Sequence, residues 1–315
     1  MGDPGASEIT VSAEALSRNF GPLAAVREVS FQLKRGEVLG FLGPNGAGKT
    51  TTMQMLTGNL APSSGGVTIC GVDLLEQPVQ AKARIGYLPE TPPLYRELSV
   101  DEYLQLAAKL HRIDRPRRAQ AVAEAKRRCG LADVGPRLIG TLSKGYQQRV
   151  GIAQAIVHEP DVVILDEPTI GLDPNQMREI RQLIREIGGS RSVILSTHIL
   201  PEVETVCDRV QIMHQGGMVY SDTIAALKRF HGGVTIEIGL RAPPAPERLA
   251  EITGVLAVER ASETVFRIQR DPERDPTDAL VEQAVAGRWG LYRLAPAQTS
   301  LEDVFVKLTR GEDEA

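Results

Sequence analysis

A glycine-rich segment that ends in a lysine and a threonine is the strongest chemical signal in the sequence. The segment comprises Gly43, Pro44, Asn45, Gly46, Ala47, Gly48, Lys49 and Thr50, which satisfies the pattern G-x-x-x-x-G-K-[ST]. Glycines let the backbone curl so that successive N–H groups point at one anion, and a following helix adds a favourable dipole. We therefore expect a phosphate-binding loop in which Lys49 bridges the outer phosphates, Thr50 ligates Mg²⁺ and Thr51 reaches an inner phosphate.

Two adjacent carboxylates follow an apolar run much later in the chain. The run Val162–Asp166 ends in the first carboxylate, and Glu167 comes directly after it. An aspartate at the tip of a buried strand, beside a phosphate loop, can hold the ligand shell of Mg²⁺. Glu167 is one step further along, where it can accept a proton from an attacking water. Together with the phosphate loop, these residues predict phosphate-bond hydrolysis rather than a plain acidic turn.

Short apolar runs that alternate with amphipathic stretches predict the elements that position these groups. Val38–Leu42, Val162–Asp166 and Val193–Thr197 are typical of strands that are buried on both faces. Lys49–Leu56 is expected to form the helix that begins at the phosphate loop. Strands that alternate with helices between residues 8 and 226 predict βαβ units and a mostly parallel sheet.

One stretch of the α/β pattern is helical throughout. From Ser99 to about Val134 we expect a helical insert, within outer limits of about 95–140, that contains helices at Val100–Leu110 and Ala119–Cys129. Basic residues gather in this stretch, but acidic residues are interspersed with them. We therefore interpret the basic clusters as a solvated helix face rather than a surface for nucleic acid or lipid.

The composition shifts after Phe230, and we expect a second domain over residues 231–315. The predicted elements are strands at Val234–Leu240, Val255–Ala261, Thr264–Gln269 and Leu291–Ala295, and helices near Glu247–Ile252, at Asp278–Ala286 and at Ser300–Thr309. The βαββαβ order of the first six elements predicts a small α+β domain of ferredoxin-like type with its helices on one face. The α/β part before it is expected to occupy residues 8–230.

The composition excludes several other classes of protein. At roughly 150 residues per domain, 315 residues suggest about two domains. The balance of 36 basic and 40 acidic residues, with 4% aromatics, argues against nucleic acid as the main partner. Three scattered cysteines (Cys70, Cys129 and Cys207) indicate a reducing compartment. We expect neither a signal peptide in residues 1–8 nor a membrane span, because no apolar run approaches about 20 residues.

A segment between the phosphate loop and the acidic strand resembles the signature motif of the ATP-binding cassette (ABC) family. It comprises Leu142, Ser143, Lys144, Gly145, Tyr146, Gln147, Gln148 and Arg149, and it precedes the helix that leads to the acidic strand. The order of the three motifs is similar to that of this family and of no other phosphate-loop class. The resemblance covers about residues 8–227 and implies an ABC cassette of the P-loop NTPase fold with a helical subdomain.

The resemblance implies roles for residues outside the phosphate loop. Phe20 matches the aromatic residue that stacks on adenine, for which a flat apolar face is suited. Gly171–Asp173 resembles the D-loop, and Ser196–His198 resembles the switch segment whose histidine contacts the γ-phosphate. Ile85–Glu90 lies where the family has its Q-loop, which makes Glu90 a further candidate ligand of Mg²⁺.

In the family the signature motif faces the nucleotide of a second cassette. Ser143 and Gly145 would open a helix whose N-terminus binds phosphate, so that two head-to-tail subunits share two ATP molecules. Lys144 and Tyr146 depart from the commonest signature, Leu-Ser-Gly-Gly-Gln, and Glu90 replaces the usual glutamine. These departures bear on specificity at the interface and on coupling to a transport partner.

Three segments narrow the resemblance to bacterial ABC-2-type exporter ATPases. These are Tyr87–Glu90, the signature motif and Ser300–Phe305. The group includes drug-efflux, gliding-motility and nitrous-oxide-reductase-maturation subunits, many with a small C-terminal domain. The resemblance implies an ATP-hydrolysing subunit, peripheral at the cytoplasmic face of the inner or plasma membrane. It would work as a homodimer, or paired with a non-identical cassette, together with an ABC-2-type transmembrane permease that docks near Pro92–Tyr95, and no nucleic-acid partner is expected.

Two other functions are open to the sequence. A soluble ABC-family ATPase could act on ribosomes or nucleic acid, but such proteins usually carry two cassettes or long coiled coils, and neither is found here. The C-terminal domain could instead bind a small regulatory molecule, although it contains no glycine-rich loop or carboxylate cluster. A structural role that extends the dimer contact is the simpler hypothesis. Truncation after Phe230 would separate these two roles of the domain.

Overall fold

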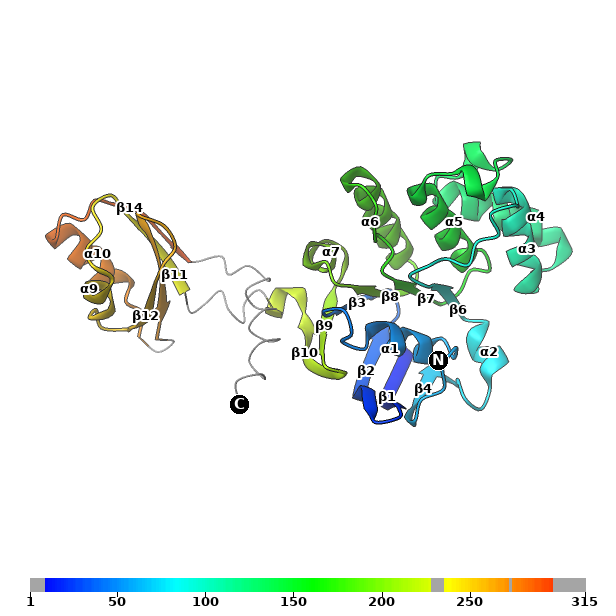
Figure 1. Cartoon of the computed structure of the whole chain (residues 1–315), viewed down its shortest axis with the longest axis horizontal. Coiled ribbons are helices and arrows are strands. Elements are labelled where there is room, and N and C mark those ends of the chain that lie inside the picture. Colours follow the sequence, from blue (N-terminus) through cyan, green and yellow to red (C-terminus); the bar gives the residue numbers. More distant parts are fainter. Residues whose placement is uncertain (1–8, 228–234, 272–273, 297–315) are drawn as a thin grey trace, which may run out of the picture. The chain divides into compact units, whose positions relative to one another are not determined.

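The chain forms two compact units, Met1–Ile224 and Ala225–Ala315, in the computed structural model. The structure describes residues 9–227, 235–271 and 274–296 (Figure 1). The sequence placed the division between the domains slightly later, at residue 230. The predicted boundary segment at Phe230 and the predicted helix Ser300–Thr309 lie outside the described residues.

A six-stranded, largely parallel sheet forms the centre of the first unit. Its strands, in sheet order, are β10 (Gly217–Thr223), β9 (Arg209–His214), β3 (Val38–Leu42), β8 (Ser192–Thr197), β7 (Val162–Asp166) and β6 (Ile85–Leu88). Every residue of β3, β7 and β8 is buried, as expected for apolar strands covered on both faces. Only β10 is antiparallel to its neighbour. The carboxyl ends of the five parallel strands therefore meet at one edge.

A second sheet, which was not predicted from the sequence, is antiparallel. Its order is β2 (Leu23–Lys34), β1 (Ile9–Phe20), β4 (Ser64–Ile69) and β5 (Val72–Asp73). The prediction of one mostly parallel sheet was therefore wrong for the N-terminal part of the unit. The reason is local: Gly21 and Pro22 join β1 to β2 in a two-residue turn, and so short a connection permits only antiparallel pairing.

Helix α1 (Lys49–Leu56) lies between the two sheets (Figure 1). One apolar cluster contains Met53 of α1, Leu33 of β2, and Phe41 and Ile164 of the central sheet. Phe31 and Phe41 meet edge to face across this layer, with 5.1 Å between their ring centroids. The start of α1, where the phosphate loop ends, is thus held from both sides.

Most of the other helices gather around the far side of the central sheet. They are α3 (Val100–Leu110), α4 (Arg115–Arg128), α5 (Lys144–Ile156), α6 (Pro174–Gly188) and α7 (Leu200–Val206), with short 3₁₀ turns at Ala132–Val134 and Ile139–Thr141. Helix α2 (Pro78–Lys82) instead contributes Ala81 to the apolar cluster on the α1 side. Ser99 and Glu102 form a capping box at the start of α3. Helix α4 begins four residues before the predicted Ala119, because Pro116 is tolerated in a first turn. No helix in the described part of the chain is long and apolar enough to cross a bilayer.

The second unit has the predicted βαββαβ order. Its elements are β11 (Thr235–Leu240), α9 (Pro246–Ala250), β12 (Val255–Arg260), β13 (Val265–Arg270), α10 (Thr277–Ala286) and β14 (Leu291–Pro296). The sheet is antiparallel in the order β12-β13-β11-β14, the split arrangement of ferredoxin-like motifs. Leu249 of α9 and Leu280 of α10 share one core with Ile238 and Phe266 of the sheet.

Candidate nucleotide-binding site

The phosphate loop connects β3 to α1, as the motif predicts. Gly48 has a φ of +102°, and a Cβ there would lie 2.6 Å from the carbonyl oxygen of Ala25. At Gly43 a Cβ would lie 2.5 Å from the carbonyl oxygen of Met213. Side chains are thus excluded at both positions by conformation or by space. No side chain caps the start of α1, so the first N–H groups of the helix remain available to an anion.

The Lys49 side chain is almost completely buried at the start of α1. Its ammonium group donates hydrogen bonds to the carbonyl oxygens of Gly43, at 2.8 Å, and Pro44, at 3.2 Å. It also lies 3.6 Å from Oε1 of Glu167. A buried cation needs such partners, because desolvation would otherwise make it costly. These contacts place the ammonium group between the loop and the end of β7.

Asp166 is fully buried at the carboxyl end of β7. Within the described residues, neither of its carboxylate oxygens has a hydrogen bond of normal geometry. Burial raises the pKa of Asp166, and the nearby Ser196 and Thr50 hydroxyls and the Lys49 cation partly offset this effect. Unsatisfied carboxylate oxygens beside a threonine hydroxyl fit Mg²⁺, which prefers one or two carboxylates together with substrate phosphates.

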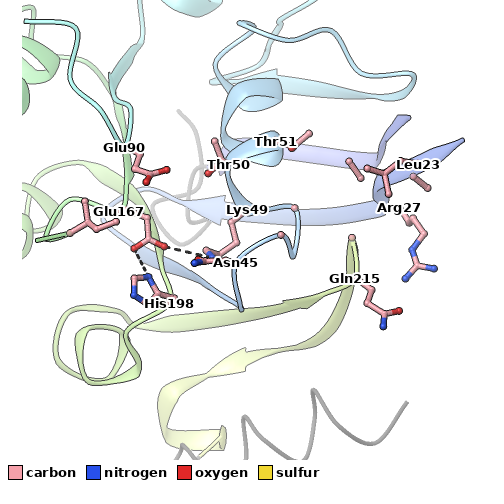
Figure 2. A pocket seen from close by; sticks show the side chains of 16 residues that line it. Leu23, Arg27, Asn45, Lys49, Thr50, Thr51, Glu90, Glu167, His198 and Gln215 are labelled. Atoms are coloured by element: carbon pink, nitrogen blue, oxygen red, sulfur yellow. Dashed lines mark hydrogen bonds and ion pairs between the residues drawn. The ribbon is translucent and has the colours of Figure 1, made fainter. Parts of the chain in front are cut away.

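Glu167 occupies a strained backbone position with φ at +49°. Its N–H donates to the carbonyl oxygen of Ser196 on the adjacent strand, at 2.9 Å. Its Oε2 accepts a hydrogen bond from Nδ1 of His198, also at 2.9 Å. Since a carboxylate can only accept, this bond places the imidazole proton on Nδ1. The carboxylate is therefore aimed back over the phosphate loop, between Lys49 and His198 (Figure 2).

These groups line one pocket of about 700 Å³. The predicted site residues that line it are Asn45, Gly46, Gly48, Lys49, Thr50, Thr51, Glu90, Glu167 and His198. Gly43, Pro44 and Ala47 belong to the same loop. Asp166 is the last residue of β7 and directly precedes Glu167 in the chain. Figure 2 shows Glu90 and Thr50 near one another, at the same end of the pocket as Glu167. The parallel register makes this convergence possible, because Leu42 pairs with Thr197 and Asp166 pairs with Ser196.

Besides Gly43, Pro44, Ala47 and Asp166, four predicted residues do not line the pocket. Phe20 ends β1 with 46% of its surface exposed, and the guanidinium of Arg18 lies 4.8 Å from its ring centroid. Ser143 caps α5, where its hydroxyl accepts from the N–H of Tyr146. Asp173 caps α6 by accepting from the N–H groups of Asn175 and Gln176, both at 3.0 Å. Gly145 is also on α5, so the signature and D-loop residues belong to a different surface of this chain.

The starts of α5 and α6 pack closely against each other. A Cβ at Gly145 would lie 2.6 Å from Cδ of Gln176, so a larger residue there would displace the Gln176 side chain. The Lys144 ammonium group lies against Gly171 of the D-loop, whose φ is +67°. The signature helix and the D-loop are thus one continuous surface in the folded chain.

Part of the pocket wall was not predicted from the sequence. Leu23, Ala24, Ala25 and Arg27 of β2 line it, as do Ile170, Gln215 and Gly216. Figure 2 shows Leu23, Arg27 and Gln215 at the end away from Glu167. The N–H of Arg27 donates to the carbonyl oxygen of Gly216, at 2.8 Å, and so joins β2 to the turn between β9 and β10. No chemical motif marks these residues, and only the positive φ of Gln215 is unusual.

A phosphate loop at a helix start, a buried aspartate that fits Mg²⁺ and a carboxylate aimed over the loop define a nucleoside triphosphatase of the phosphate-loop class. The ABC transporter family model matches residues 26–170. The chain is 32% identical to an uncharacterized ABC transporter ATP-binding protein, YxlF, of Bacillus subtilis (strain 168) over 96% of this chain and all of that protein. The chain belongs to the ABC transporter ATP-binding proteins, which bind and hydrolyse ATP.

Two further likenesses extend this assignment. The linearmycin resistance ATP-binding protein LnrL of Bacillus subtilis (strain 168) is 32% identical over 95% of this chain and 98% of its own length. A solved ATP-binding subunit of an ABC transporter is 32% identical, with a TM-score of 0.64 over 71% of this chain and 93% of its own. The predicted ABC cassette fold and the predicted ATPase activity are confirmed.

Proposed function

We propose that the chain energises a membrane exporter of the ABC-2 type from the cytoplasmic face of the membrane, where it binds peripherally to a permease. The observation that carries the proposal is the position of Lys49, Glu167 and His198 in one pocket while Ser143 lies on another surface. One chain therefore contains a phosphate loop and a phosphate-facing helix start that serve different nucleotides. The resistance protein LnrL, which is similar along almost the whole chain, supports a role in export.

The phosphate loop and Lys49 bind the triphosphate of ATP. The uncapped N–H groups at the start of α1 donate hydrogen bonds to the phosphate oxygens, and Thr50 and Asp166 would hold Mg²⁺. When bound, the metal ion supplies Lewis-acid stabilisation of the phosphate oxygens. Phe20 and the β2 side of the pocket accommodate the base, and Thr51 reaches an inner phosphate.

Glu167 acts as the general base. It takes a proton from a water molecule whose oxygen attacks the γ-phosphorus, while the bond to the bridging oxygen breaks and ADP leaves. His198 orients this carboxylate through the 2.9 Å hydrogen bond, and its ring lines the part of the pocket where the γ-phosphate would lie. Lys49, 3.6 Å from Glu167, compensates the negative charge that gathers there.

A second copy of the chain completes each site. Ser143 and Gly145 at the start of α5 bind the γ-phosphate held by the partner, and Asp173 at the start of α6 borders the same interface. Two ATP molecules would thus join a head-to-tail homodimer, and hydrolysis would release it. Opening and closing would move the permease through the surface near Glu90 and Tyr95, whose side chain is 52% exposed.

The first test replaces the proposed base. Glu167→Gln keeps the size of the side chain but cannot accept a proton, so the turnover of ATP should fall by about 100-fold or more. ATP affinity, measured by equilibrium binding of a fluorescent nucleotide, should stay within about threefold of the parent. Glu14→Gln, at an exposed position on β1, is the control and should hydrolyse ATP at the parent rate. Parent-rate hydrolysis by Glu167→Gln would exclude this residue as the base.

The second test concerns the transport partner. The membrane protein encoded beside this chain would be reconstituted with it in liposomes, and ATP hydrolysis would be measured with and without that protein. We expect the rate to rise when the membrane protein is present and to be abolished by Glu167→Gln. Association with ribosomes, and none with the membrane protein, would instead favour an ABC ATPase of translation.

A further inference from the structure

Glu202 is a buried carboxylate that does not line the nucleotide pocket. It belongs to the first turn of α7, and 1% of its surface is exposed. A carboxylate so deeply buried is costly unless hydrogen bonds and an opposite charge compensate it. Its partners come from the segments that carry the two proposed hydrolytic residues.

Two contacts of Glu202 fix the backbone on either side of His198. The hydroxyl of Thr197, the residue before His198, donates to Oε2 of Glu202 at 2.8 Å. The same hydroxyl oxygen accepts a hydrogen bond from the N–H of Ile199, the residue after His198, at 3.0 Å. The N–H of Glu202 in turn donates to the carbonyl oxygen of Ile199, at 3.1 Å. The three hydrogen bonds join Thr197, Ile199 and Glu202 in a closed ring, and His198 lies between two of these residues in the chain.

A third contact reaches the segment that carries Glu167. The hydroxyl of Thr169, two residues after Glu167, donates to Oε1 of Glu202. Thr169 is itself buried, and the N–H of Ile170 donates to the carbonyl oxygen of Glu167, at 3.1 Å. This turn holds Glu167 in its left-handed conformation. Glu202 thus joins the turn after β7 to the turn after β8.

Arg181 of α6 supplies the compensating charge. Its guanidinium lies 3.5 Å from Oε1 of Glu202, and its side chain is 22% exposed. Two hydroxyl donors and one cation therefore satisfy the buried carboxylate. Because the D-loop residue Asp173 caps the start of α6, the same carboxylate also contacts the helix that borders the proposed dimer interface.

We propose that Glu202 is a positioning residue for ATP hydrolysis, which keeps the backbone of Glu167 and His198 at the separation that their 2.9 Å hydrogen bond requires. The inference rests on the hydrolytic roles proposed above for these two residues. Glu202 has no contact with the pocket, so it acts on the rate of hydrolysis and not on nucleotide binding. A shift of an ångström in a general base is enough to lower turnover substantially.

The test uses the full chain and two variants that break the same ring. Glu202→Gln removes the charge and one acceptor, and Thr197→Val removes the hydroxyl with little change of shape. Each should lower kcat about tenfold, the effect of losing about 1.4 kcal/mol of positioning. The KM for ATP and the amount of nucleotide bound per chain should stay within about twofold of the parent. Glu204→Gln, exposed on the same helix, is the matched control and should keep the parent rate.

Combining the two substitutions separates positioning from general instability. In the Glu202→Gln/Thr197→Val chain, kcat should fall no further than in either single variant, because both act through one ring. The inference is overturned if Glu202→Gln keeps the parent kcat. It is also overturned if nucleotide bound per chain falls in step with kcat, which indicates only a loss of folded protein. Failure of the proposed function is seen separately, as unchanged hydrolysis in Glu167→Gln.

Discussion

The two units of the chain differ in what they bury. Among the described residues, every buried polar or charged side chain belongs to the first unit, including Lys49, Asp166, Glu167 and Glu202. The described residues of the second unit, 235–271 and 274–296, bury only apolar side chains, such as Ile238, Phe266 and Trp289. Burying a charged group costs free energy, and a core that serves only to hold the fold together does not need such groups. The first unit thus buries charged groups of the nucleotide site, whereas the described part of the second unit has a purely apolar core.

Backbone strain is present at the functional site of the first unit. Glu167 is held with positive φ at the end of β7, and Gly48 is held with φ at +102° against the backbone of Ala25. Gly48 belongs to the phosphate loop, and Glu167 is the proposed base. Strain at such positions persists only where the surrounding structure fixes it. Substitutions in the two units should therefore have separable effects, on activity in one and on stability in the other.

The largest effect is expected in the apolar core of the second unit. Phe266 is 1% exposed, so Phe266→Ala should lower the free energy of unfolding of this unit by about 4 kcal/mol. Urea unfolding followed by the fluorescence of Trp289, the one tryptophan of the chain, reports on this unit. Val285→Ala, 70% exposed on α10, should change that free energy by less than about 0.5 kcal/mol. ATP affinity should be the same in both variants. A tenfold loss of ATP affinity in Phe266→Ala would contradict the view that the two units can be changed independently.

A substitution in the phosphate loop should instead lower ATP affinity and leave the stability of the second unit unchanged. Gly48→Ala places a methyl group 2.6 Å from the Ala25 carbonyl oxygen in a conformation that alanine avoids. ATP affinity should fall about 100-fold, equivalent to about 2.7 kcal/mol, in a nucleotide-binding titration. Gly66→Ala is the matched control, because a Cβ there meets no atom within 4 Å. The unfolding of the second unit should not change in either variant, and normal ATP binding by Gly48→Ala would contradict the geometry of the loop.

The smallest effect is a pH dependence that belongs to the cassette. Burial lowers the pKa of His158 to about 3, with a further contribution from His111, whose ring is stacked 3.6 Å away. The unfolded chain protonates this histidine below about 6.5, whereas the folded chain does not until about pH 3. Stability is therefore lost as the pH falls through this window, by about 2 kcal/mol at pH 5.

Urea unfolding at pH 7 and pH 5 tests this prediction. In the parent, the unfolding transition of the cassette, followed by far-ultraviolet circular dichroism, should occur at a lower urea concentration at pH 5 than at pH 7. The difference between the two pH values should be smaller in His158→Gln. The fluorescence of Trp289 provides an internal reference, because residues 235–271 and 274–296 contain no histidine. An equal pH dependence in parent and variant would show that His158 does not titrate as described.

The sequence predicted the parts of the site that are marked by local chemistry. Helix Lys49–Leu56 and strand Val162–Asp166 have the expected bounds, because a motif fixes the start of the helix and the carboxylates mark the end of the strand. Residues 9–34 form an antiparallel hairpin whose alternation was not interpreted as strands. The Gln215 turn comes to the pocket only through sheet pairing. Glu202 likewise has no local motif, since Thr169 and Thr197 meet it only in the folded chain.

The most direct test of the account is whether nucleotide is shared between two chains. Glu167→Gln would be saturated with ATP and Mg²⁺, and its mass and nucleotide content would be measured by sedimentation and by extraction. We predict two chains with two ATP molecules, and a return to single chains when Ser143→Arg is added to block the start of α5. A Glu167→Gln chain that binds one ATP and stays monomeric at every concentration tested would contradict the claim that each chain holds half of two sites.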